Sequence, residues 1–245
     1  PLGLMTRHGI GPSPDSVQYI KAARELVAGG GDVPSRTGAQ FAPLYSLLLA
    51  GTGALVGDPM DGARWLNVLL FGLNIALVGM IVRRTTKNAP WLWVLGSLLM
   101  LGSMPMLSVH LSALSEPLFL LFGLLGLYWL GLYLDSGRPR LLAGAVAAVS
   151  LAFLARYAGA AWVMAGGIAI LAWGVRPMLR RIGTAVLFGV ASSLPMVAWL
   201  LWNAADGGSA TGRELLVHPI GRSHVWQAVY TASGWILVPP SAPNV

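Results

Sequence analysis

The chain has 245 residues and a mass of 25.8 kDa, of which 56% are apolar and only 10% are Asp, Glu, Lys or Arg. A soluble domain carries about 25% charged residues, so a mean hydropathy of +0.68 excludes a water-soluble enzyme or nucleic-acid binder of this size. The 16 basic residues against nine acidic ones give a net charge of +7, which indicates cytoplasmic loop charges beside anionic lipid. Cysteine is absent, which excludes disulfide bridges and thiolate metal sites.

The first forty residues contain no apolar run that could serve as a signal peptide or a spanning helix, and residue 1 is Pro. Ile20, Ala23 and Leu26 follow Asp15 at helical spacing and predict a short amphipathic helix on the membrane surface. We therefore expect residues 1–40 to form an outer-face loop, in a fragment that lacks the first and the last helices of a larger protein.

Apolar runs of about 17 to 25 residues predict the membrane helices, because this length crosses roughly 30 Å of hydrocarbon. The shorter apolar stretch 41–56 is bounded by Pro residues and predicts a juxtamembrane half-span. The stretch 141–175 is too long for one crossing and has Arg156 as its only charge, so we expect two short helices that turn near Arg156. The remaining spans are expected at 63–82, 90–109, 117–134 and 183–202.

The sequence thus predicts an all-α membrane protein with about six transmembrane helices in a polytopic bundle, a half-span and an amphipathic helix, in one domain over 1–245. Eight of the sixteen basic residues lie in three loops, each two spans after the previous one, at 83–87, 138–140 and 176–181. The positive-inside rule places these loops in the cytoplasm. Residues 1–40 and 203–245 are then expected on the outer side of the cell (inner) membrane.

Polar residues of functional type are expected together on that outer side. Membrane enzymes that act on lipid-borne substrates have sites at such a face, whereas channels and carriers need polar groups within their spans. No nucleotide-binding or serine-hydrolase motif occurs in the chain. The outer-face candidates are Asp15, His110, Glu116, Arg156, Asn203, Glu214 and His218.

Two acidic residues on the outer side each allow a structural and a functional interpretation. Asp15 precedes the amphipathic helix, where a carboxylate can act as the N-cap or as a general base that takes a proton from an acceptor hydroxyl. Glu116 opens the span 117–134. It either stabilises the helix N-terminus as a first-turn acid after an N-cap at Ser115, or faces a polar cleft or a cation.

The basic candidates are equally open to two interpretations. Arg156 either extends its side chain to the interface or holds a phosphate or an acid in an outer cavity. Arg64, beside Trp65, is either an interfacial anchor or a second phosphate ligand. His110 is a substrate-binding candidate, and its isolation from other ligand residues argues against a metal site there. No cofactor is predicted, although a divalent metal stays open.

Five short strings occur in the order typical of one class of membrane enzymes. They are PDSVQY (14–19), APLY (42–45), ARWLN (63–67), SEPLF (115–119) and ARYAG (155–159). In this order the chain resembles the GT-C class of integral-membrane glycosyltransferases, which includes protein O-mannosyltransferases, lipid A aminoarabinose transferases and RgtA/B/C/D-like bacterial enzymes. The chain departs from that pattern at Ser16, where relatives often carry a second acid, and at Trp202, where they often carry Arg.

The resemblance implies transfer of a sugar from a polyprenyl-phosphate donor to a lipid, glycan or protein acceptor at the outer membrane surface, with inversion as the usual outcome. It implies that Asp15 is the catalytic base or donor-binding acid. Glu116 matches an acid at the outer end of a later span, and Arg156, with Arg64 as the weaker candidate, matches a ligand of the lipid phosphate. The expected partners are these substrates and the bilayer, without nucleic acid. A polytopic transporter or lipid flippase and a non-catalytic membrane scaffold are the alternatives.

Overall fold

The computed structural model describes residues 2–7, 9–11, 13–29, 40–87, 89, 91–207, 210–211 and 221–236. Of these residues 84% are helical, which confirms the all-α class. Contacts divide the chain into two units, Pro1–Gly212 and Arg213–Val245. The second unit contains α11 (Arg222–Ile236), and all other helices belong to the first. The single domain expected from the sequence stays a prediction.

The amphipathic helix expected near the N-terminus is α2 (Pro14–Val27), which follows the short α1 (Leu2–Met5). Its N-cap is Ser13, whose Oγ accepts the backbone N–H of Ser16 at 3.1 Å. The N-cap interpretation of Asp15 is therefore wrong. Pro14 already occupies the first helical position, so Asp15 lies inside the first turn of α2. The helix dipole stabilises its negative charge there, but its side chain is not the N-cap.

Three helices in the described part of the chain are long and apolar enough to cross a membrane. They are α4 (Pro59–Thr85), α7 (Glu116–Ser136) and α10 (Met178–Gly207, of which 178–205 qualifies). A fourth span results if α5 (Leu92–Gly102) and α6 (Met104–His110) count as one helix that bends by 59° around Ser103. The predicted half-span is α3 (Pro43–Val56).

The long apolar stretch 141–175 forms two short helices, as predicted. Arg156 adopts an extended backbone between α8 (Pro139–Ala155) and α9 (Ala160–Trp173), with a 3₁₀ turn at Tyr157–Gly159. At ~1.5 Å per residue, the 17 residues of α8 and the 14 of α9 extend about 26 and 21 Å, less than the roughly 30 Å of hydrocarbon. By length and composition, the described residues contain three helices able to span a membrane, or up to four, and six are not confirmed.

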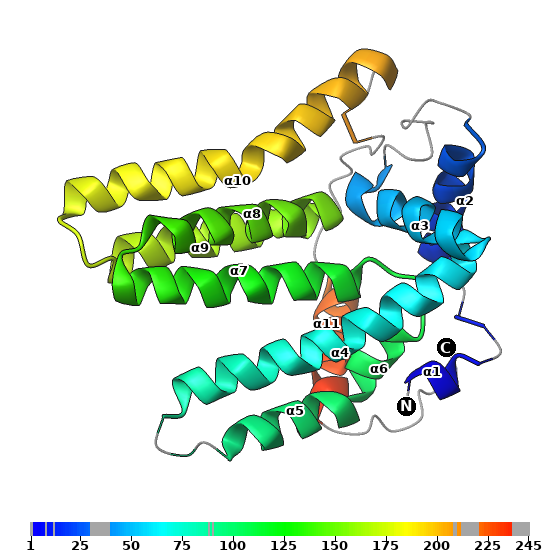
Figure 1. Cartoon of the computed structure of the whole chain (residues 1–245), viewed down its shortest axis with the longest axis horizontal. Helices are drawn as coiled ribbons and strands as arrows, with labels where there is room; N and C mark the ends of the chain where they lie inside the picture. Colours follow the sequence, from blue (N-terminus) through cyan, green and yellow to red (C-terminus); the bar gives the residue numbers. More distant parts are fainter. Residues whose placement is uncertain are drawn as a thin grey trace. The chain divides into compact units, whose positions relative to one another are not determined.

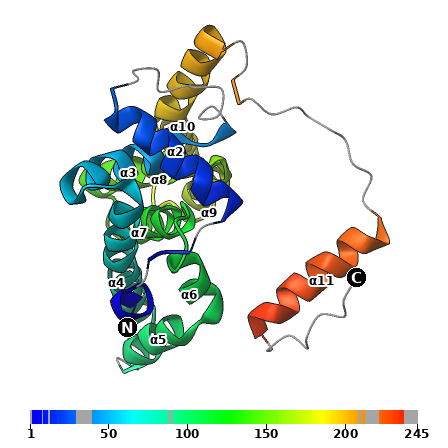
Figure 2. The ribbon, with the colours of Figure 1, turned by 90° about the vertical axis from the view of Figure 1, so that its right-hand side faces the viewer.

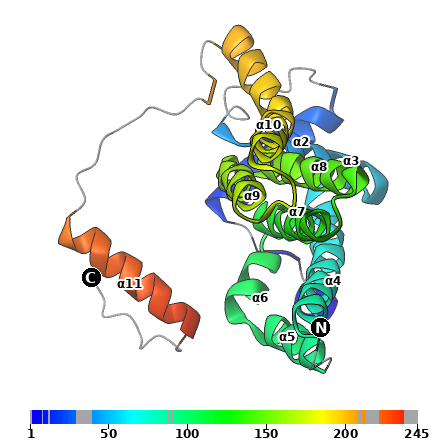
Figure 3. The same cartoon turned by 90° about the vertical axis from the view of Figure 1, so that its left-hand side faces the viewer.

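The long helices of the first unit run between two ends of different chemistry (Figure 1). The α4–α5, α7–α8 and α9–α10 loops carry the three basic clusters and lie at one end, which faces the viewer in Figure 3. We call this the basic end. At the other end, α2 and α3 lie across the termini of the long helices (Figure 2). We call this the polar end, and it includes Glu116, Arg156 and the first turn of α4.

Two contacts hold α2 and α3 against α4 at the polar end. Arg24 of α2 donates from Nε and Nη2 to the two carboxylate oxygens of Asp58, at 3.1 and 3.2 Å, and Asp58 also caps α4. The crossing of α3 and α4 needs glycine, because a Cβ on Gly62 would lie 2.8 Å from the backbone nitrogen of Gly53. These contacts fix the helix that carries Asp15 relative to the start of α4.

Candidate functional site at the polar end

An ion pair between α7 and the α8–α9 turn forms the centre of the polar end. Arg156 Nη1 lies 2.6 Å from Glu116 Oε1 and donates to Ser115 Oγ at 3.2 Å. The Arg156 and Glu116 side chains are 32% and 30% exposed. The chain folds this way because α8 ends just before Arg156, so that its side chain turns towards the N-terminus of α7 and does not continue along an apolar helix face.

Tyr19 of α2 is the fourth residue of this group, which it joins through its contact with Ser115. Its hydroxyl lies 3.0 Å from Ser115 Oγ, and its ring meets that of Tyr45 edge-on at a centroid distance of 5.0 Å. Burial raises the pKa of the Tyr19 hydroxyl above its ordinary value, against the opposing effect of the hydrogen bond with Ser115. Tyr19 is therefore protonated at neutral pH. We call Tyr19, Ser115, Glu116 and Arg156 the polar cluster.

Three buried polar atoms in or beside the polar cluster have no hydrogen-bond partner among the described residues. They are Glu116 Oε2, the Tyr45 hydroxyl and Gln18 Oε1. Buried polar atoms are nearly always paired, with protein groups, ordered water or a ligand. Glu116 thus uses one carboxylate oxygen to hold Arg156 and keeps the other for a further hydrogen-bond donor.

Asp15 lies on the exposed side of the first turn of α2. No hydrogen bond or ion pair joins its carboxylate to another described residue. Its negative charge is one of those that raise the pKa of Tyr19, so it lies within electrostatic reach of the polar cluster. The structure therefore pairs Glu116 with Arg156 and places Asp15 about one helical turn before Tyr19 on α2.

Arg64 is not part of this group. Its Nε donates to Thr6 Oγ1 at 3.3 Å and its Nη2 to the Gly3 carbonyl at 3.2 Å, and its guanidinium lies 5.2 Å from the centroid of the Trp65 ring. These contacts attach the N-terminal segment to α4. This intramolecular role differs from both the interfacial anchor and the phosphate ligand expected from the sequence, which stay predictions.

His110 is also engaged in structure. Its side chain is fully buried, and Nδ1 lies 2.7 Å from the Met106 carbonyl, which can only accept, so Nδ1 carries the proton. Nε2 then accepts from Asn74 Nδ2 at 3.2 Å. Both ring nitrogens are occupied, which leaves none for a substrate. No group of three or more potential metal ligands occurs among the residues that the structure describes.

The remaining outer-face candidates lie apart from the polar cluster or outside the described residues. Asn203 is buried and donates from Nδ2 to the Ala210 carbonyl at 3.3 Å. Glu214 and His218 lie outside the described residues.

Sequence reasoning missed Tyr19 and Tyr45 and assigned Ser115 a different task. Ser115 occupies the N-cap position of α7, but its side chain makes no capping bond and serves Tyr19 and Arg156 instead. Tyr19 and Ser115 are 96 positions apart in sequence, so no local pattern could have paired them. The sequence did contain one indication, since Tyr19 lies on the apolar face of an amphipathic helix and its hydroxyl would need a hydrogen-bond partner when buried.

Comparisons with protein-family models, with curated proteins and with solved structures find no match to this chain. The described part of the chain is thus helical, with three, or up to four, helices able to span a membrane and a charged cluster at one end of the first unit.

We expect Tyr19→Phe to lower the free energy of unfolding by about 1 kcal/mol, because it removes one buried hydrogen bond and keeps the ring contacts. The measurement is the thermal unfolding midpoint in detergent. Tyr128→Phe is the matched control, since its hydroxyl has no hydrogen bond to a described residue. Equal midpoints for the two variants would contradict a stabilising Tyr19–Ser115 bond.

Proposed function

We propose that the protein is a glycosyltransferase that takes a sugar from a polyprenyl-phosphate donor and transfers it to a lipid, glycan or protein acceptor. The observation that carries this proposal is the Glu116–Arg156 pair, which lies beneath a helix whose first turn presents the free carboxylate of Asp15. Such a transfer needs a cation that binds the phosphate of the donor and a carboxylate that takes the proton of the acceptor hydroxyl.

Arg156 has the role of phosphate ligand in this proposal. Its contacts with Glu116 and Ser115 both use Nη1. A guanidinium has five N–H donors, so its other nitrogens can bind phosphate oxygens. Glu116 is a positioning residue, since its Oε1 holds the guanidinium in place.

Asp15 has the role of general base. Its carboxylate takes the proton of the acceptor hydroxyl, and the hydroxyl oxygen forms a bond to the anomeric carbon of the sugar. The bond from that carbon to the phosphate oxygen breaks, and the polyprenyl phosphate leaves with the electron pair. Arg156 stabilises the charge that develops on this phosphate. A single displacement of this kind inverts the anomeric configuration.

A groove between α2, the helix that carries Asp15, and the start of α4 supports the proposal. It has a volume of about 420 Å³ and is open on one side. Its apolar wall suits a lipid-borne substrate, whose chain needs an apolar surface while its polar end reacts. The groove is lined by Val17, Ile20, Lys21, Arg24, Glu25 and Met60, from α2 and the start of α4.

The six-helix topology and the outer-face location of the site belong to this proposal. The helices α8 and α9 both run between the polar end and the basic end (Figure 1), and a bilayer thins locally around spans that are too short for it. If α8, α9 and the bent α5–α6 pair each cross the membrane, the three basic loops lie on the same side of the membrane. The positive-inside rule makes that side cytoplasmic and the polar end external.

Transport of a substrate across the membrane is a second candidate, favoured by the bend between α5 and α6. Broken helices that carry polar residues are typical of transporter binding sites. Asn67 and Asn74 of α4 are fully buried and contact His110 at the C-terminal end of α6, where Asn67 Nδ2 donates to the His110 carbonyl at 3.0 Å. Asn67 Oδ1 and Asn74 Oδ1 have no partner among the described residues.

The test is a transfer assay with the full-length protein in membranes. Radiolabelled polyprenyl-phosphate sugars are offered as donors, with nucleotide sugars in parallel. We expect labelled product from a lipid-linked donor alone, because α2, which contacts the polar cluster through Tyr19, also lines an apolar groove. Absence of transfer from every lipid-linked sugar, together with uptake of a solute into vesicles, would overturn the proposal in favour of transport.

A further inference from the structure

The basic end contains a concentration of positive charge, most of which has no ion-pair partner among the described residues. The sequence has no acidic residue between Asp135 and Asp206, but six arginines in that interval. The α7–α8 and α9–α10 loops touch, since a Cβ on Gly137 would lie 4.0 Å from Val175 Cγ2. Five of the six arginines therefore lie at or beside two adjoining loops, namely Arg138, Arg140, Arg176, Arg180 and Arg181.

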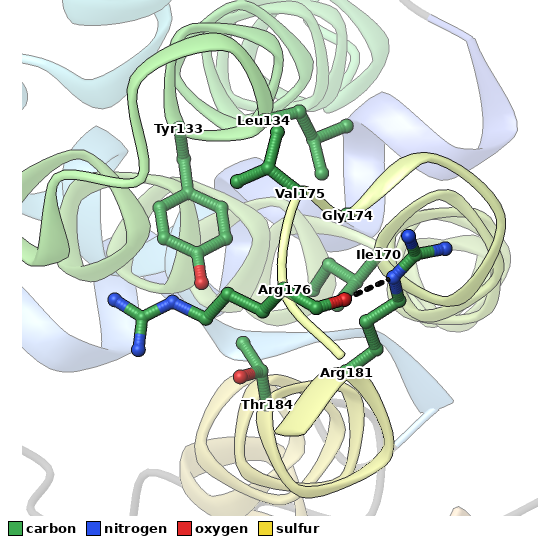
Figure 4. Close-up of a pocket in the computed structure, with 8 residues that line it drawn as sticks. All are labelled: Tyr133, Leu134, Ile170, Gly174, Val175, Arg176, Arg181 and Thr184. Carbon is green, nitrogen blue, oxygen red and sulfur yellow. Dashed lines mark hydrogen bonds between the residues drawn. The ribbon is translucent and has the colours of Figure 1, made fainter. Parts of the chain in front are cut away.

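A small pocket opens between these loops and the helices α7, α9 and α10 (Figure 4). Tyr133 forms one wall with a side chain that is only 7% exposed, and its hydroxyl points to the same side as the Arg176 guanidinium. Neither the hydroxyl nor the guanidinium has a hydrogen bond or an ion pair with another described residue. The two groups are thus free donors at the mouth of one pocket.

Arg181 fixes the loop that carries Arg176. Its Nε donates to the Arg176 carbonyl at 2.7 Å, and its Nη1 donates to the carbonyls of Leu171 and Ala172 at 3.1 and 3.3 Å. These are carbonyls at the C-terminus of α9, which need such partners. The backbone at Arg176 is therefore held against the end of α9, and its charge stays beside Tyr133.

Three exposed apolar residues, which we call the apolar border, lie in or next to the α9–α10 loop that lines the pocket. Trp173, Val175 and Leu179 are 70%, 68% and 82% exposed. Tryptophan and arginine at the ends of apolar helices are typical of the level of lipid headgroups. A soluble anion has no apolar surface to bury against this border, whereas the acyl chains of a lipid do.

We propose that Tyr133 and Arg176 bind the phosphate group of an anionic phospholipid, whose acyl chains lie against Trp173, Val175 and Leu179. The pocket admits one group about the size of a water molecule, which suits a single phosphate oxygen. That oxygen accepts the Tyr133 hydroxyl, and the Arg176 guanidinium binds the other oxygens of the phosphate at the pocket mouth. This site is separate from the polar end and does not depend on the proposed transfer activity.

The experiment is native mass spectrometry of the full-length protein titrated with phosphatidylglycerol and, in parallel, with phosphatidylcholine. We expect the wild-type protein to retain phosphatidylglycerol preferentially. Arg176→Gln should weaken that binding about tenfold, because it removes charge-assisted hydrogen bonds. Tyr133→Phe should weaken it about threefold through the loss of one neutral hydrogen bond, and it preserves the buried ring if the Arg176 variant fails to fold.

Arg140→Gln is the matched control, because it removes the same charge at the same end but does not line the pocket. We expect its affinity to stay within about twofold of the wild type. An equal loss in Arg140→Gln and Arg176→Gln would show a diffuse surface charge and overturn the site. Equal retention of both lipids would overturn it as well, and release of phosphatidylglycerol by excess inorganic phosphate would overturn its assignment to a lipid.

Discussion

Replacement of Asp15 by Asn should lower the rate of sugar transfer about 10²- to 10⁴-fold, which is the usual contribution of a positioned general base. Asparagine keeps the size of the side chain but cannot take a proton from the acceptor hydroxyl. Asp15 makes no hydrogen bond or ion pair with another described residue, so we expect the fold and the expression level to be unchanged. The measurement is initial transfer rate in membranes at matched expression, with a lipid-linked donor in excess.

Asp61→Asn is the control for that measurement. Asp61 is also an exposed acid in the first turn of a helix that begins with Pro, in α4 at the same end of the molecule. Its replacement changes net charge by the same amount and should leave transfer within about twofold of the wild type. A wild-type rate in Asp15→Asn would end the assignment of Asp15 as the base, and equal losses in both variants would show an effect of charge alone.

Gly159→Ala is expected to destabilise the protein by about 3 kcal/mol and to lower its unfolding midpoint by roughly 10 °C. A Cβ at this position would collide with the Cα atom of Phe153 and lie 2.7 Å from its nitrogen. These are backbone atoms of α8, which cannot move aside as the end of a flexible side chain can. The turn between α8 and α9 must then open, and it carries Arg156 away from Glu116.

The matched control is Gly167→Ala in α9, where the added Cβ meets nothing within 4 Å. A helical Gly→Ala change at an open position should leave stability unchanged or raise it by up to about 1 kcal/mol. Thermal unfolding followed in the same detergent checks both variants. Equal midpoints would show that the tight turn does not limit stability, and normal transfer activity in Gly159→Ala would show that the turn does not position Arg156.

Much of the secondary structure follows from local pattern. The amphipathic spacing after Asp15 predicts α2, and long apolar runs predict α4, α7 and α10, because each depends on side chains within a few turns of one another. The break at Arg156 was predictable for the same reason, since 35 apolar residues exceed a single crossing. The bend at Ser103 was not, and the predicted span 90–109 is two helices at 59°.

The candidate site was predictable only in part. Asp15, Glu116 and Arg156 stand out because charged residues at the ends of apolar helices are costly unless they have a task. The ion pair between Glu116 and Arg156 could not be predicted from the sequence, because Arg156 was also compatible with a position at the membrane interface. His110 and Arg64 show the converse, because both have the right chemistry in the sequence and both are engaged by structural partners.

The sequence by itself determined the helical class, the apolar solvent that several helices require, and the grouping of basic residues into three loops. These properties depend on amino-acid composition and on hydrophobic periodicity, which can be recognised within short stretches of the chain. Only the tertiary structure decided which charges meet. Tyr19 reaches Ser115 across 96 positions, and Arg156 reaches Glu116 from the α8–α9 turn, because burial of apolar faces brings α2, α7 and α8 together. Such contacts depend on packing over the whole unit, and no local stretch of sequence contains that information.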